Sequence, residues 1–188
     1  QYGDYFRTMR WYGAPGYDDG GPGAIGERNF FDAKLSASIA ACYDRERVWG
    51  ELFHSTGWGF SPDDQLAGIV ENVCYGCTLY DQHGLYYTSL GGWWEHAPGD
   101  FHFRQPYWEH VEGLNDAATR LSYLFSRGDR VVDAAVLVPS STLHADWHPD
   151  DGVGDRGNRA DAVTREVAES LYEAGIDPLL VDPDSVAD

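Results

Sequence analysis

The chain has little lysine and little cysteine, and it contains no long hydrophobic run. Lys34 is the only lysine among 13 basic residues, which face 31 acidic residues and give a formal net charge of −18. This charge argues against a surface for nucleic acid or for anionic lipid, because both would be repelled. Aspartates are dispersed over the whole chain, and we interpret the resulting hydrated surface as an adaptation to high salt, which screens self-repulsion.

The three cysteines are too few for a disulfide framework, so disulfides are not expected to hold the fold. Cys74 and Cys77 have the spacing of redox and zinc sites, but no second ligand pair accompanies them, and we expect a buried structural role. No run of 18 apolar residues is present, so no membrane-spanning helix is predicted. Gln1 begins neither a signal peptide nor a chain with an initiator methionine, which leaves cytoplasmic and secreted locations open.

The composition is that of globular material, with 43% hydrophobic and 14% aromatic residues. Caps and helical spacing predict helices over 32–42, from Ser61 or Pro62 through Val73, over 106–127 and over 159–174. Strands are predicted over 47–53, 77–81, 131–138 and 176–181. This alternation predicts an α/β fold with parallel strands. Residues 1–31, rich in Gly, Pro, Asp and aromatics, are expected to form a structured loop near a binding site.

The stretch 47–60 combines the features of a catalytic site. Its apolar and aromatic strand carries one carboxylate, Glu51, at the exit, and a Gly-rich loop with His54 and Trp58 follows. A glutamate at the end of a buried strand has either a charge partner or a chemical role. We take Glu51 as the candidate catalytic acid; the alternative is a glutamate held by an arginine or by backbone N–H groups.

If these strands belong to a (β/α) barrel, Glu51, His54, Asp81 and His83 lie at the carboxyl ends of strands, where such barrels place catalysis. The loops behind them add aromatic and ionisable side chains, namely Trp58, Tyr86, Tyr87, Trp93, Trp94, Glu95, His96, His102 and Trp108. Rings stack on the C–H faces of sugars and charged groups bind hydroxyls, so this combination predicts a carbohydrate site. Core packing explains any single tryptophan equally well.

Glycoside hydrolysis requires two carboxyl groups, about 5 to 5.5 Å apart for retention of configuration or about 6.5 to 9.5 Å apart for inversion. Glu51 is one candidate. The second is expected upstream of Gln1; the possible substitutes within the chain, otherwise substrate or cation ligands, are Asp18, Glu27, Asp81 and Glu95.

Two other chemistries remain open. A metal hydrolase could draw ligands from Glu51, His54, Asp81, His83, His96 and His102, but the HExxH spacing is absent. The Gly-rich segment 151–157 superficially suggests a nucleotide site. It lacks both the GxGxxG spacing and the P-loop lysine, and its aspartates would repel phosphate.

Several long segments resemble bacterial glycoside hydrolases of the α-L-rhamnosidase type, family 106 and its relatives. Between about Arg10 and Trp147 these segments are RWYGAPGYD, DAKLSASIAACYDRERVWGELFHSTGWG, HGLYYTSLGGWWEHAPGDFHFRQPYWEH, RLSYLFSRG and DAAVLVP. The resemblance implies that residues 1–128 are the C-terminal part of a (β/α)8 catalytic barrel. Residues 129–188 would be the first β-α-β unit of a doubly wound, flavodoxin-like or amidotransferase-like α/β domain. We therefore expect an internal fragment of a longer polypeptide.

The resemblance also implies roles for single residues. Glu51 would be the catalytic base or nucleophile, and the sugar subsite would be lined by His54, Trp58, His83, Trp93 and Trp94. The general acid is expected on an earlier strand, so the chain alone is expected to be inactive. Calcium is associated with some relatives, and no other cofactor is predicted. The partner is a carbohydrate, and the alternative function is a non-catalytic carbohydrate-binding segment that uses the same aromatic side chains.

Overall fold

The computed structural model describes residues 3–18, 29–88, 90 and 99–187. The helices are α1 (Tyr5–Met9), α2 (Phe30–Cys42), α3 (Pro62–Tyr75), α4 (Val111–Phe125), α5 (Ser140–Ala145), α6 (Asp155–Glu173) and α7 (Pro183–Ala187), with a 3-10 turn η2 at Trp108–His110. The strands are β1 (Gly16–Asp18), β2 (Trp49–Leu52), β3 (Leu79–Gln82), β4 (Ala134–Leu137), β5 (Trp147–His148), β6 (Gly152–Val153) and β7 (Pro178–Val181). No described helix is long and apolar enough to cross a membrane.

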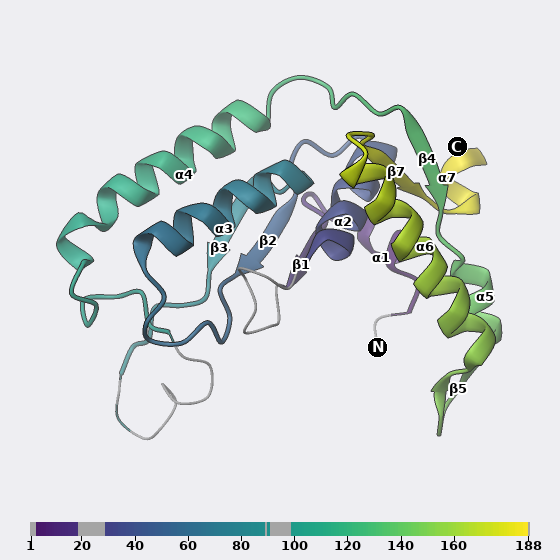
Figure 1. Ribbon diagram of the computed structural model, residues 1–188, viewed down its shortest axis with the longest axis horizontal. Coiled ribbons are helices and arrows are strands. Elements are labelled where there is room, and N and C mark those ends of the chain that lie inside the picture. Colours follow the sequence, from purple (N-terminus) through teal and green to yellow (C-terminus); the bar gives the residue numbers. More distant parts are fainter. Residues whose placement is uncertain (1–2, 19–28, 89, 91–98, 188) are drawn as a thin grey trace.

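The strands form two parallel sheets and one hairpin (Figure 1). β1, β2 and β3 make a three-stranded parallel sheet with β2 in the centre, β4 pairs with β7 in parallel, and β5 pairs with β6 antiparallel. The α/β fold with parallel strands is thus confirmed. The described strands form open sheets, and the barrel itself stays a prediction, as does the division at residue 128.

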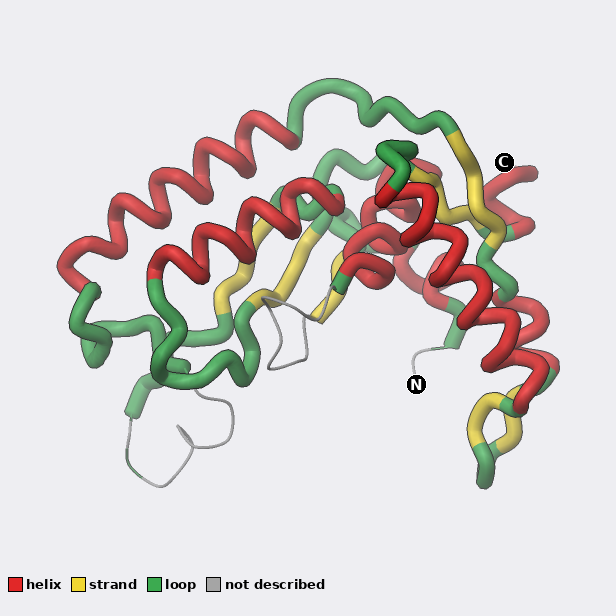
Figure 2. The backbone as a smooth tube through the Cα atoms, in the orientation of Figure 1, coloured by secondary structure: helices red, strands yellow, loops and turns green. Residues whose placement is uncertain are grey.

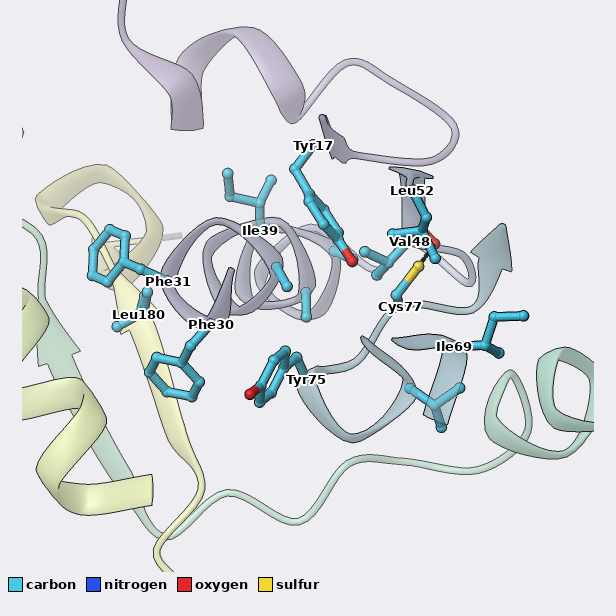
Figure 3. Close-up of a cluster of buried hydrophobic side chains, with 14 of the residues drawn as sticks. Tyr17, Phe30, Phe31, Ile39, Val48, Leu52, Ile69, Tyr75, Cys77 and Leu180 are labelled. Carbon is cyan, nitrogen blue, oxygen red and sulfur yellow. Dashed lines mark hydrogen bonds between the residues drawn. The ribbon is translucent and has the colours of Figure 1, made fainter. Parts of the chain in front are cut away.

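Helix α2 is the centre of the packing, between the first sheet and β7 (Figures 1 and 3). Small side chains such as Ala33, Ala37 and Ala40 are buried along it and allow neighbouring elements to approach closely. Ser38 is also fully buried, and its hydroxyl accepts a hydrogen bond from the Leu180 backbone N–H of β7 at 2.9 Å. The helix therefore holds the two sheets in one hydrophobic core.

Lys34 of α2 supplies the charged contact between these two parts. Its ammonium group is fully buried and lies 2.5 Å from the Asp177 carboxylate, which also accepts hydrogen bonds from Arg130 Nε and Nη2 at 2.7 Å each. The Lys34 ammonium also lies 4.9 Å from the centre of the Tyr172 ring. The only lysine of the chain is thus used inside the fold and not on its surface.

Helix α3 begins where its sequence predicts and continues two residues beyond the predicted end at Val73. Ser61 is the N-cap: its hydroxyl accepts from the Asp64 N–H, the Asp64 carboxylate accepts from the Ser61 N–H, and Pro62 occupies the first turn. Gly76 ends the helix with φ +108°, a left-handed conformation that glycine adopts readily. These signals fix the direction in which the chain enters β3.

The largest departures from the sequence prediction are at 1–31 and 145–158. The first region contains α1 and β1 where only a loop was expected, and the second contains the β5–β6 hairpin and the first turn of α6 (Figure 2). Strands of two or three residues give too few positions for an alternating pattern, so tertiary pairing decides them.

Gly50 in β2 packs closely against β1 and the segment that leads into β3. A Cβ at this position would lie 2.9 Å from Cys77 Sγ and 2.9 Å from the Tyr17 hydroxyl, which is held by a 2.5 Å hydrogen bond to Asn72 Oδ1. We expect Gly50→Ala to lower the free energy of unfolding by about 1 to 3 kcal/mol, measured by urea unfolding. Gly59→Ala is the control, since nothing lies within 4 Å of a Cβ there; an equal loss in both variants would contradict this packing.

The two cysteines of the CxxC pair differ in environment. Cys77 is fully buried, as predicted, and its thiol donates weakly to the carbonyl oxygens of Val48 at 3.7 Å and Leu79 at 3.6 Å. Cys74 is exposed, so the prediction of a buried role is wrong for this residue. Cys74 lies on the solvent side of α3, so only one thiol of the pair, that of Cys77, is buried.

Burial raises the pKa of the Cys77 thiol from 9.0 to about 11. Between these values the unfolded chain loses a proton that the folded chain keeps, so this contribution to stability is full below pH 9 and is lost as the pH rises towards 11. We expect the stability of the wild type relative to Cys77→Ala to fall by about 2 to 3 kcal/mol over this range, measured by urea unfolding at each pH. Cys74→Ala should keep the wild-type dependence; a Cys77→Ala profile parallel to the wild type would contradict the assignment.

Candidate functional site

Three carboxylates lie side by side at the carboxyl end of the first sheet. Asp18 of β1 pairs in register with Glu51 of β2, and Glu51 pairs in register with Asp81 of β3. Neighbouring strands are about 4.8 Å apart, and paired residues of parallel strands project from the same face. Glu51 is therefore flanked on both sides by an acidic residue.

This acidic row faces away from the helices. Gly50 and Leu52 are buried, and a side chain at Gly50 would point towards Tyr17 and Cys77 on the helix-covered face. Because side chains alternate along a strand, Glu51 projects from the opposite face. It is half-buried, and its carboxylate forms no hydrogen bond or ion pair with the residues that the structure describes. Among the described residues, no arginine holds Glu51.

Two histidines lie together in the loops that follow β2 and β3. The rings of His54 and His83 are 4.8 Å apart at an edge-to-face angle, and the His83 ring lies 6.1 Å from the Tyr86 ring. His54 Nδ1 is 3.1 Å from the Ser55 hydroxyl. His83 Nδ1 is buried without a hydrogen-bond partner among the described residues. The structure therefore brings together His54 and His83, as the sequence predicts for a site at the strand ends.

Exposed aromatic side chains are present on the same loops. Trp58 is 39% exposed, Tyr87 is fully exposed, and Trp108 packs its ring 5.0 Å from His102 while remaining 36% exposed. The predicted residues Trp93, Trp94, Glu95 and His96, together with Glu27, lie outside the described residues. Their predicted roles stay predictions.

A buried aromatic cluster supports these loops from beneath. Phe53 packs against Phe60 at 5.1 Å and against Phe101 at 5.9 Å between ring centres. Phe53 and Ser55 have φ values of 74° and 62°, a left-handed conformation that costs about 1 to 3 kcal/mol in residues other than glycine. The fully buried Phe53 ring holds this strained turn, which carries His54.

The described residues contain no group of three His, Cys, Asp or Glu side chains that could hold a metal ion. Asp18, Glu51 and Asp81 do not point towards a common position for a metal ion, so these three residues do not fit a calcium site in this arrangement. A cavity of about 780 Å³ lies elsewhere, at the opposite end of the sheet, where its lining includes Val48, Thr78, Arg130 and Asp177. Glu51 does not line this cavity.

The Gly-rich segment 151–157 has a structural role. The Gly157 N–H at the start of α6 donates to the Asp146 carboxylate at 2.7 Å, and the Gly154 N–H donates to the Asp146 carbonyl at 2.8 Å. This carboxylate occupies the helix N-terminus, where a phosphate would bind in a nucleotide site. The geometry does not support nucleotide binding at this segment.

Comparison with known proteins gives a likeness of fold. A rhamnosidase from Novosphingobium sp. PP1Y superposes with a TM-score of 0.65 at 16% sequence identity, over 96% of this chain and 16% of that chain. The likeness is one of fold alone. The chain thus spans about 16% of the length of this rhamnosidase. No family model matches the sequence, and no curated protein matches it.

Proposed function

We propose that the chain is part of a glycoside hydrolase of the α-L-rhamnosidase type, family 106 or a relative, which cleaves a terminal glycosidic bond. Glu51 is its catalytic base or nucleophile. His54, Trp58, Asp81 and His83 bind the sugar, together with Trp93, Trp94 and Glu95. The remainder of the same polypeptide supplies the other walls of the site. The fold shared with a rhamnosidase supports this proposal.

One observation carries the proposal. Glu51 stands between Asp18 and Asp81 on the face away from the helices, with no neutralising partner among the described residues. Three adjacent carboxylates repel one another, and a fold accepts such an arrangement where the charges serve binding or catalysis. His54 and His83 add hydrogen-bond donors within the neighbouring loops.

The register limits which residues can act with Glu51. A strand spacing of about 4.8 Å puts Asp18 and Asp81 near the carboxylate separation of about 5 to 5.5 Å that retaining enzymes use. Either aspartate can therefore serve as the second carboxyl group, unless a strand outside this chain supplies the general acid.

Hydrolysis of 4-nitrophenyl α-L-rhamnopyranoside by the polypeptide that contains this chain tests the proposal. We expect nitrophenol release with this probe to exceed that with the matching α-D-mannoside and β-D-glucoside, which present the same leaving group. Equal rates with all three probes would contradict the sugar class. No release with any aryl glycoside would contradict the hydrolase.

The exposed aromatic side chains favour one second candidate, a non-catalytic carbohydrate-binding segment. Trp58, Tyr87 and Trp108 offer ring faces that bind sugars without any carboxylate. Sugar binding without hydrolysis, in wild type and Glu51→Gln alike, would favour this candidate over the enzyme.

A further inference from the structure

A fully buried carboxylate, that of Asp100, lies beside the loops that carry His54 and His83. Asp100 is fully buried, although it is charged and lies in a loop. One of its oxygens accepts hydrogen bonds from the backbone N–H groups of Tyr86 at 3.3 Å and His102 at 3.1 Å. The other oxygen pairs with the Arg104 guanidinium. Among the described residues, the hydrogen bonds of this carboxylate run to segments that border the candidate site.

Arg104 also contacts the backbone of the segment that contains Tyr86. Arg104 Nη1 donates to the Tyr86 carbonyl at 3.1 Å as well as to the Asp100 carboxylate. Two backbone hydrogen bonds lie beside it, from Gly84 N to Gly99 O at 3.4 Å and from Phe101 N to Gly84 O at 3.0 Å. The segments 84–86 and 99–104 are therefore fastened together, and we call this arrangement the Asp100 clasp.

The clasp is fitted closely against the loop that follows β2. A Cβ at Gly99 would lie 2.7 Å from the Gly57 carbonyl oxygen, so only glycine permits this approach. Phe101, next to Asp100, packs against Phe53 of the strained turn. Displacement of the clasp therefore shifts the loop of His54 as well as the loop of His83.

We propose that Asp100 is a positioning residue of the sugar site: its buried carboxylate, paired with Arg104, fixes Tyr86 and His102 so that the loops bearing His54 and His83 hold the sugar. This inference rests on the proposed function and assigns Asp100 no contact with the substrate. A buried, paired carboxylate that accepts from two backbone N–H groups sets loop position more rigidly than apolar packing does.

Asp100→Asn tests the inference because it keeps the shape and removes the charge. The binding of L-rhamnose is measured by calorimetry and the hydrolysis of 4-nitrophenyl α-L-rhamnopyranoside by initial rates, in the polypeptide that contains this chain. We expect Kd and KM to rise by at least about tenfold, with kcat at saturation close to wild type, since displaced loops weaken binding. Asp116→Asn, an exposed residue of α4 with the same change of charge, should leave all three values unchanged.

A purely structural role gives a different result. Loss of folded protein lowers the apparent kcat in proportion and leaves KM and Kd at their wild-type values, and this outcome would overturn the inference. If Asp100→Asn does not fold, Arg104→Lys weakens the same clasp while keeping its charge; a raised Kd supports the inference and an unchanged Kd overturns it.

The same measurements separate this inference from the proposed function. If Glu51→Gln keeps the wild-type kcat, the catalytic assignment fails, and the Kd of Asp100→Asn still decides the role of the clasp. If Glu51→Gln loses turnover while Asp100→Asn binds like the wild type, the inference fails alone. A wild type that binds neither probe contradicts both.

Discussion

Glu51→Gln is expected to lower the kcat for 4-nitrophenyl α-L-rhamnopyranoside by about 10²- to 10⁴-fold, the usual contribution of a positioned acid or base. The amide fills the same space but neither accepts a proton nor attacks the sugar. Because a neutral hydrogen bond replaces a charged one, the Kd for L-rhamnose should change by less than about tenfold. Initial rates and calorimetry on the same preparation measure the two effects separately.

Two kinds of control sharpen this expectation. Glu112→Gln changes an exposed glutamate of α4 and should keep the wild-type rate. Asp18→Asn and Asp81→Asn change the neighbours of Glu51 in the acidic row. If one of them supplies the second carboxyl group, that variant alone should match the loss in Glu51→Gln. A kcat of Glu51→Gln equal to that of Glu112→Gln would contradict the catalytic role.

Asp177→Asn is expected to have the largest effect on stability, a loss of about 3 to 5 kcal/mol in the free energy of unfolding. Among the described residues, Asp177 is the carboxylate that pairs with Lys34 and Arg130, so the change leaves the buried Lys34 ammonium beside the Arg130 guanidinium without a negative charge. Like charges without a partner in a buried site are costly. Urea unfolding at neutral pH measures the loss, and a change below about 1 kcal/mol would contradict it.

The pH dependence and a double variant test the same cluster. Burial, reinforced by Arg130, lowers the pKa of Lys34 from 10.5 to about 8. In this range the unfolded chain binds the proton that the folded chain has lost, so this residue makes stability rise with pH from about 8 to 10.5. Lys34→Met should remove that rise. In Asp177→Asn combined with Lys34→Met, the loss should be smaller than the sum of the single losses, because the isolated buried ammonium is gone.

Local sequence signals predicted the parts of the fold that depend on local chemistry. The cap at Ser61 predicted the start of α3, and the apolar stripe that ends at Val73 predicted its end to within two residues. The apolar runs around β2, β3 and β7 predicted parallel strands, which the pairings confirm. β1 was not predicted because its three residues follow a region of glycine and proline, and its pairing with β2 determines it.

The site was only partly predictable for a related reason. The position of Glu51 at a strand exit and the histidines of the next loops followed from the chain order. The register that puts Asp18 beside Glu51 depends on tertiary pairing. Asp100 was not predicted as a site residue, because the residues around it in the sequence do not separate a buried aspartate from the many exposed ones. Only the spacing of four residues to Arg104 hinted at a pair.

The most direct measurement of the central claim is rescue of Glu51→Ala by azide, followed by the release of 4-nitrophenol. Removing the side chain leaves room for a small anion where the carboxylate was, so added azide should raise the rate in a saturable way in this variant and leave the wild type unaffected. A Glu51→Ala protein that turns over at the wild-type rate without azide would contradict the account.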